Sequence, residues 1–266
     1  MKIDFHTHIM PDELAKRALD SILKGNPTYR AECEGDTKST LKALKDGGAD
    51  SAVVLNIANN PQKQHKVNDF AASLQKEHSN LYCFGSVYPG SENELDEMKR
   101  CIDMGLYGLK LHPGYQDFYI DDENVFNFYE NAEKLGILLA FHVGYDPICT
   151  NSSCSSPLRL AKVAKMFSNL KIIAAHMGGF KDEESAKHLI GIENVYLDTS
   201  LASCFLSKSC MKDMIQKHGT DKILFGSDSP WGSTKKESDF IESLELSSHD
   251  LELIFRKNAQ KLLLKE

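Results

Sequence analysis

Eight short apolar stretches recur along the chain, and each is followed by loop or helical sequence. They span residues 3–8, 51–57, 81–87, 107–112, 137–143, 171–176, 195–199 and 222–228. Apolar residues recur at helical spacing in the intervening segments 61–77 and 125–135, and a last helix is expected over 251–262. Strands that alternate with helices form a parallel α/β sheet, and eight such units close into a (β/α)₈ TIM barrel. An open doubly wound sheet is the alternative, but no G-x-G-x-x-G motif follows the first strand.

Composition narrows the class of protein. The 266 residues contain no linker or low-complexity tract, so a single domain over residues 1–266 is expected. The net charge of −7 and the lack of a dense Lys/Arg tract argue against a nucleic-acid partner. No apolar run has the length of a membrane-spanning helix, and the first strand begins too early for a signal peptide. Seven cysteines without a CxxC pair suit a reducing compartment, so we expect a cytoplasmic protein.

Metal-ligating and charged side chains cluster at the ends of the predicted strands. The C-terminal ends of the strands form the face of a barrel that carries the active site. On the first strand, His6 and His8 are two residues apart and share one face, so one metal ion can bind both imidazoles. The polar residues at these ends are His6, His8, Lys110, His112, His142, His176 and Asp228.

Side-chain alternation supports this arrangement. Small residues are predicted one layer below the polar cluster on the same strand faces, which leaves space for a site. Large apolar residues on the opposite faces are predicted to pack against the outer helices. The small set is Gly108, Ala140, Ala174 and Gly226; the large set is Leu109, Leu111, Phe141, Ile173 and Phe225.

Five motifs in this order resemble the amidohydrolase superfamily. They are DFHTH at residues 4–8, GLKLHP at 108–113, FHVG at 141–144, AHMGG at 175–179 and GSDSPW at 226–231. Within the superfamily, the chain is most similar to the amidohydrolase-related branch that contains aminocarboxymuconate-semialdehyde decarboxylase-like enzymes. The resemblance covers nearly the whole chain and allows a homodimer.

The resemblance implies a divalent metal, with zinc expected and manganese as an alternative. In a mononuclear site, His6, His8, His142 and Asp228 would hold the ion, and His176 would transfer protons. In a binuclear site, Lys110 would match the carbamylated, bridging lysine of dihydroorotases. His6, His8 and Asp228 would then hold one ion and His142 with His176 the other. An unmodified Lys110 would instead bind an anionic substrate.

A metal-dependent hydrolase is the predicted activity. A bound zinc ion lowers the pKa of its water from about 15.7 towards about 7. Asp228 would accept the water's proton and His176 would serve as second acid or base, cleaving an amide, lactone or ester bond in a small carboxylated molecule. A decarboxylase or hydratase on the same residues is the alternative, and a non-catalytic binding barrel a more distant one. TatD-type deoxyribonucleases also begin with a His-x-His strand, but their pattern has a glutamate where this chain has Lys110, which argues against that activity.

Several residues have two interpretations. His112 and Trp231 are predicted to bind substrate, with loop packing as the alternative, and Asp4 would either orient a ligand histidine or stabilise the fold. Cys149 and Cys154 are expected to be free thiols, with a redox-sensitive lid as the alternative. The segments 10–36, expected to be polar and loop-rich, and 145–155 are predicted to cover the pocket. Solvent exposure is expected for His65, His78, His188, His218 and His249.

Overall fold

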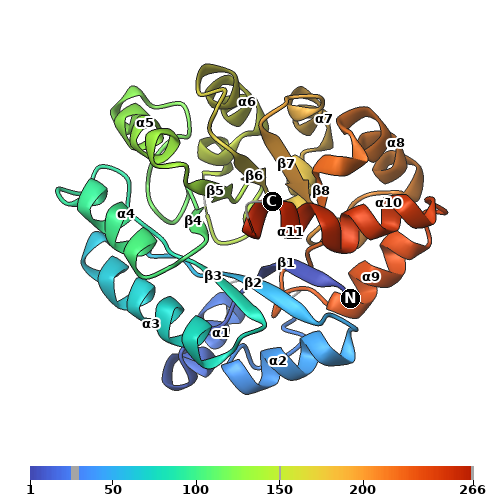
Figure 1. Ribbon diagram of the computed structural model, residues 1–266, viewed down its shortest axis with the longest axis horizontal. Coiled ribbons are helices and arrows are strands. Elements are labelled where there is room, and N and C mark those ends of the chain that lie inside the picture. The colour runs from blue at the N-terminus through green and yellow to red at the C-terminus, as the bar shows by residue number, and fades with distance from the viewer. Residues whose placement is uncertain (25–29, 150, 265–266) are drawn as a thin grey trace.

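The computed structural model describes residues 1–24, 30–149 and 151–264. Eight parallel strands surround the centre of the molecule, and helices form a ring outside them (Figure 1). The predicted parallel α/β architecture is therefore confirmed. The strands are β1 Ile3–Thr7, β2 Ser51–Leu55, β3 Leu81–Phe84, β4 Gly108–Leu111, β5 Leu138–Phe141, β6 Ile172–Ala174, β7 Val195–Asp198 and β8 Ile223–Leu224.

The strand ladder is interrupted at two places, which divides it into the sheets β1-β2-β3 and β4-β5-β6-β7-β8. Backbone hydrogen bonds cross both gaps. Gly85 N donates to Gly108 O at 2.9 Å between β3 and β4. At the other gap, Phe5 N donates to Phe225 O at 2.7 Å and Asp228 N to His6 O at 2.8 Å. These bonds bring the ends of β8 and β1 together.

The helices follow the strands in chain order. They are α1 Asp12–Lys24, α2 Thr37–Asp46, α3 Gln64–Glu77, α4 Glu94–Asp103, α5 Phe126–Leu135, α6 Pro157–Met166, α7 Glu183–Ala186, α8 Lys208–His218, α9 Thr234–Glu242, α10 Ser248–Glu252 and α11 Asn258–Leu263. Helix α1 corrects the expectation of a polar loop over residues 10–36. Its Ala15 and Leu19 lie four residues apart and are buried, a helical spacing that the surrounding charged residues obscure. Residues 25–29 of that segment lie outside the described residues.

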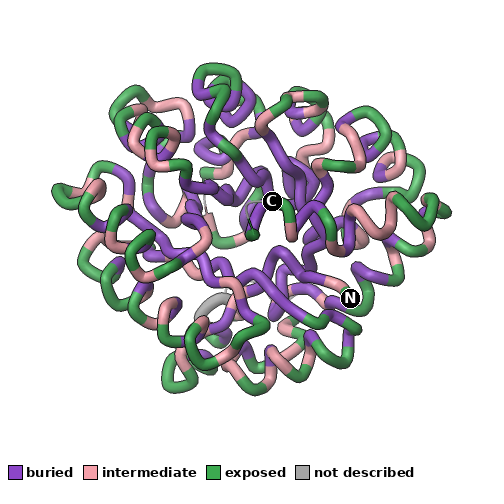
Figure 2. Tube along the Cα trace, viewed as in Figure 1, coloured by how far each residue is buried: buried purple, intermediate pink, exposed green. Residues whose placement is uncertain are grey.

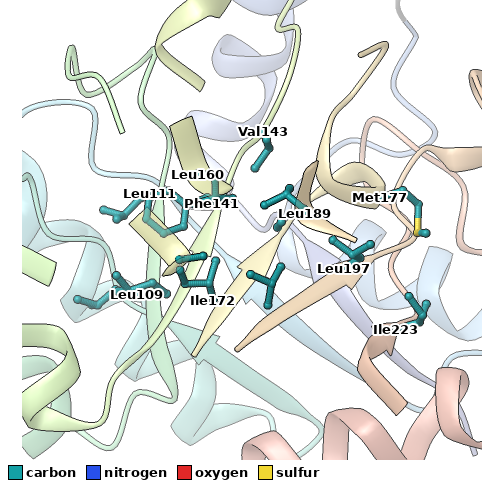
Figure 3. Packing of buried hydrophobic residues seen from close by; sticks show 14 of the residues in the cluster. Leu109, Leu111, Phe141, Val143, Leu160, Ile172, Met177, Leu189, Leu197 and Ile223 are labelled. Atoms are coloured by element: carbon teal, nitrogen blue, oxygen red, sulfur yellow. The ribbon is translucent and has the colours of Figure 1, made fainter. Parts of the chain in front are cut away.

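Two apolar layers hold the barrel together. The outer layer lies between the strands and the helices, where Leu109, Leu111 and Phe141 pack (Figure 3). The inner layer includes Phe5 and Leu138 and is closed by α11, which crosses the barrel axis in Figure 1. The strand residues are buried except for the half-buried Tyr82 of β3, and exposed positions lie mainly on the outer helices and loops (Figure 2). No helix among the described residues is long and apolar enough to cross a membrane.

Candidate metal centre and active site

A cavity of about 570 Å³ opens at the C-terminal ends of the strands. Every residue that the sequence predicted for the site lines it. These residues are His6, His8, Lys110, His112, His142, His176, Asp228 and Trp231. The structure therefore brings together side chains from β1, β4, β5, β6 and β8 that are up to 225 residues apart in sequence.

Irregularities in the backbone at the ends of β1 and β8 direct His6 and Asp228 into the cavity. The register of β1 against β2 shifts between Asp4 and Thr7, so one extra residue of β1 is accommodated beside His6. On the other side, Asp228 has a left-handed φ of 68°. Gly226 leaves the room that this approach requires, since a Cβ at this position would lie 2.9 Å from His6 Cβ.

Strand β6 departs from the predicted alternation. Ile173 packs in the inner layer and Ala174 in the outer one, the reverse of the prediction. A tight turn follows the strand directly, and in it His176 and Met177 have φ values of 58° and 53°. The turn redirects His176 into the cavity, so His176 reaches the site although Ala174 faces away from it. The predicted alternation is confirmed for β4 and β5, where Leu109, Leu111 and Phe141 all face outward.

His6, His8 and Asp228 form a compact donor set. Asp228 Oδ1 lies 3.3 Å from His6 Nε2 and 3.1 Å from His8 Nε2. One donor atom from each of the three residues lies within 4.8 Å of the others. Two imidazole nitrogens and a carboxylate oxygen are donors that zinc and manganese accept in proteins. The residues present therefore fit a divalent metal.

Asp198 at the end of β7 was missed by the sequence analysis, although it too ends a predicted strand. It is fully buried, and its Oδ2 lies 2.9 Å from His6 Nδ1. Its Oδ1 accepts hydrogen bonds from the backbone N–H groups of His176 (3.1 Å) and Ser200 (3.0 Å) and from Ser200 Oγ. Because the carboxylate accepts the Nδ1 proton of His6, the lone pair of His6 Nε2 is directed at Asp228 and His8, as a metal ligand requires.

The pKa shifts within the cluster favour a neutral His6 beside ionised Asp198 and Asp228. Burial and the nearby Lys110 ammonium together lower the pKa of His6 to about 4, against the opposing attraction of Asp198 and Asp228, so the imidazole is neutral at pH 7. Burial opposes ionisation of Asp198, but His6 and Ser200 stabilise its charge and hold its pKa below the usual range. Burial likewise opposes ionisation of Asp228, while His6, His8 and His176 lower its pKa. Both carboxyl groups are therefore ionised.

Lys110 is buried beside the donor set. Its Nζ lies 3.4 Å from His6 Nε2, and burial lowers its pKa to about 8 against the opposing attraction of Asp198 and Asp228. The ammonium form therefore predominates at pH 7, with a neutral fraction of about a tenth. A neutral amine can form a carbamate, whereas the ammonium form can bind an anion, so both predicted roles of Lys110 are chemically open.

A second group of side chains stacks beside the first. The His112 ring lies parallel to the rings of Tyr115 (3.7 Å) and His142 (4.2 Å). His142 Nδ1 lies 3.2 Å from His176 Nε2, which links the stack to the turn after β6. Burial lowers the pKa values of His112 and His142, so both imidazoles are neutral at pH 7.

Asp146, in the loop after β5, orients this stack and was also missed. Its Oδ2 lies 3.4 Å from His112 Nε2 and accepts a hydrogen bond from the Tyr115 hydroxyl at 3.2 Å. His112 Nδ1 accepts from Tyr115 N at 3.3 Å, so Nε2 carries the ring proton and points at Asp146. Asp146, His112 and His142 also lie close enough to one another to form a metal-binding group. The two hydrogen bonds of His112 favour a positioning role for that ring.

The structure also gives the surroundings of Asp4 and His218, two residues for which the sequence analysis made predictions. Asp4 accepts hydrogen bonds from Ser227 N (2.9 Å) and Thr234 Oγ1 (3.0 Å), so its carboxyl group holds the loop after β8. His218 corrects the expectation of exposure: it is buried at the end of α8, with Nε2 3.0 Å from Val195 O. His218 follows Met214 and Ile215 on the inner side of that helix, so tertiary packing covers it.

Of the segment 145–155 that was predicted to cover the pocket, the first part lines the cavity, through Tyr145, Asp146, Pro147 and Ile148. Cys149 and Cys154 beyond them are free thiols. Burial raises the pKa of the Cys149 thiol to about 12, so little reactive thiolate forms at neutral pH.

Known proteins place this site in a family. A family model described as amidohydrolase matches residues 3–264. The chain belongs to the amidohydrolase family. The predicted superfamily is thereby confirmed, and this amidohydrolase is an enzyme of a metal-dependent class. A curated relative, the dihydroorotase of Helicobacter pylori (strain HPAG1), is 26% identical over 191 residues. The match covers 68% of this chain and 53% of the relative, so the chain spans about half the relative's length.

Solved structures share the fold of this amidohydrolase. An uncharacterised TIM-barrel protein of Bordetella bronchiseptica superposes with a TM-score of 0.82 at 17% identity, covering 99% of this chain and 98% of that one. A dihydroxybenzoic acid decarboxylase of Polaromonas sp. JS666, with bound manganese and the inhibitor 2-nitroresorcinol, gives 0.77 at 19% identity, covering 99% and 96%. These likenesses confirm the predicted TIM barrel.

Proposed function

We propose that this amidohydrolase is a metal-dependent lyase that releases CO₂ from a small aromatic or otherwise unsaturated carboxylic acid. The proposal rests on the contrast between one buried cation in the cavity and a wall that is largely apolar. One buried ammonium group, that of Lys110, lies beside the histidines and can pair with a carboxylate. Much of the remaining wall is apolar and suits a hydrocarbon ring; it includes Ile9, Met10, Ile57, Phe180, Leu201 and Trp231.

In this proposal, His6, His8, His142 and Asp228 hold one divalent ion, either zinc or manganese. When bound, the metal supplies a Lewis acid that stabilises negative charge developing on the substrate. Asp198 keeps His6 in the tautomer that presents Nε2. The Asp146–His112 pair keeps the ring next to His142 in place.

The residues of this chain then handle the carboxylate and the proton. Lys110 binds the substrate before the carbon–carbon bond breaks, and His112 and Trp231 enclose the ring. As CO₂ leaves, its bonding electron pair stays on the substrate carbon, and one proton must reach that carbon. We assign this transfer to Asp228 and His176, the two predicted catalytic residues. Because Asp228 is ionised, it first takes up a proton from water, and this proton replaces CO₂ on the carbon. His176 Nδ1 lies 2.9 Å from Ser200 Oγ and 3.2 Å from Ser200 O, and its Nε2 lies 3.2 Å from His142 Nδ1, on the cavity side.

Hydrolysis of an amide, lactone or ester is the second candidate, and two observations favour it. The curated relative that is 26% identical over 191 residues is a dihydroorotase. The lowered pKa of Lys110 also favours the neutral amine that carbamate formation requires. Here Asp228 would accept the proton of the attacking water.

One assay separates the two candidates. The protein loaded with zinc or manganese is incubated with a panel of hydroxybenzoates and other unsaturated acids, and CO₂ is measured alongside the ring opening of dihydroorotate. CO₂ release that Asp228→Asn abolishes at unchanged metal content supports the lyase. Ring opening without CO₂ release refutes it and favours hydrolysis. Elemental analysis of the same sample distinguishes a mononuclear site from a carbamate-bridged pair of ions.

A further inference from the structure

The cavity continues beyond the histidines into a space lined by two helices. From the start of the chain, Pro11, Leu14 and Ala18 line it, at the spacing of one face of α1. The segment that opens α3 also lines the cavity, through Lys63, Lys66, Val67 and Phe70, which again share one helical face. We call this part of the cavity, lined by these seven residues, the α1–α3 arm.

Apolar side chains in the α1–α3 arm are not fully covered. Leu14 is 49% exposed, and Val67 and Phe70 are only partly buried. Leaving such side chains in contact with water forgoes about 25 cal/mol for each Å² of apolar surface. The proposed chemistry at Lys110 and Asp228 does not use them. Their contribution to a binding site is therefore to hold an apolar part of the ligand.

The α1–α3 arm also carries positive charge. Lys63 and Lys66 are exposed, and neither forms an ion pair within the described part of the chain. The acidic residues that line the cavity are Asp146 and Asp228, and both contact histidines of the candidate site. A negatively charged group that reaches the α1–α3 arm would therefore meet two lysines and no lining carboxylate.

We infer that the substrate is an elongated diacid: its reacting carboxylate lies at Lys110, its apolar body lies between α1 and α3, and its second anionic group lies at Lys63 and Lys66. This inference rests on the proposed function, since it specifies which carboxylic acid that site accepts. The cavity volume of about 570 Å³ agrees with it. Pockets of about 300–1,000 Å³ enclose drug-sized ligands, and a single benzoate ring would leave much of this space to water.

Binding of non-reacting probes tests the inference separately from catalysis. Biphenyl-4,4′-dicarboxylate and biphenyl-4-carboxylate are titrated by calorimetry into the metal-loaded protein. We expect the diacid to bind more tightly, and the double variant Lys63→Ala/Lys66→Ala to weaken diacid binding about tenfold, which corresponds to about 1.4 kcal/mol. Binding of the monoacid should not change. Lys76→Ala, an exposed lysine of α3 outside the cavity, is the matched control.

The apolar wall is tested by Leu14→Gln, at a half-exposed position where folding should tolerate the change. Both probes should bind more weakly to this variant. Equal binding of the two acids, or equal losses in the double variant and in Lys76→Ala, would overturn the inference. A dimer in light scattering that Leu14→Gln dissociates, with probe binding unchanged, would assign the wall to a second copy of the chain and also overturn it. Lysine-dependent diacid binding without CO₂ release from any acid would instead refute only the proposed lyase activity.

Discussion

Asp198→Asn should weaken metal binding by acting on the protonation of His6. All four groups that Asp198 meets are donors: His6 Nδ1, the N–H groups of His176 and Ser200, and Ser200 Oγ. Asparagine offers one acceptor oxygen and one donor amide. Three donors converge on Oδ1, so the oxygen will remain there and the amide will face His6 Nδ1. His6 must then accept at Nδ1 and carry its proton on Nε2.

The expected loss of metal affinity follows from this change in the tautomer of His6. A protonated Nε2 cannot bind a metal ion and would instead donate towards Asp228 Oδ1, 3.3 Å away. Loss of an outer-shell partner of a metal-bound histidine typically costs 10–100-fold in affinity. We expect the upper part of this range, about 2–2.7 kcal/mol, because the amide enforces the wrong tautomer.

Competition with a chromophoric chelator measures the affinity for zinc, and urea unfolding of the metal-free protein reports any separate loss of stability. Asp4→Asn is the matched control, since Asp4 is equally buried but contacts His6 only through its backbone N–H. Burial raises the pKa of Asp4 to about 7, so the amide resembles its protonated form. Wild-type zinc affinity in Asp198→Asn, or equal losses in both variants, would refute the reasoning.

Three further predictions concern stability and the metal. Burial raises the pKa of Glu237 from 4.5 to about 7, so the folded state binds a proton that the unfolded chain releases, and stability falls as the pH rises between these values. Glu237→Gln should remove a pH dependence of roughly 3 kcal/mol, measured by urea unfolding at pH 5 and pH 8; parallel curves would contradict this. Gly232→Ala places a Cβ 2.0 Å from Ser227 O, so it should displace the loop that carries Asp228 and lower both the melting temperature and zinc affinity; a wild-type melting curve would argue against it. Zinc or manganese at about 100 times its Kd should stabilise the metal-free protein by about 2.7 kcal/mol in thermal unfolding, and the absence of any shift would count against the metal centre.

Much of the fold and most of the candidate site followed from local sequence pattern. Strand periodicity does not depend on distant contacts, so the eight strands and their order were predictable. The polar residues His6, His142 and Asp228 interrupt apolar stretches at strand ends, and parallel strands bring those ends to one face. Barrel topology alone therefore predicted that they would meet.

Tertiary structure decided the direction of His176 and the role of Asp198, which strand alternation and local polarity could not predict. Ile173 and Ala174 face the opposite way from the prediction, and the left-handed turn at His176 and Met177 still brings His176 to the site, because a positive φ rotates the chain out of the strand pattern. Asp198 gained its role from a hydrogen bond to His6, 192 positions away in the chain. The amino-acid sequence by itself determined which chemical groups reach the mouth of the barrel. Packing between distant strands decided which nitrogen of each imidazole carries the proton, because a tautomer depends on the partner that the other nitrogen meets.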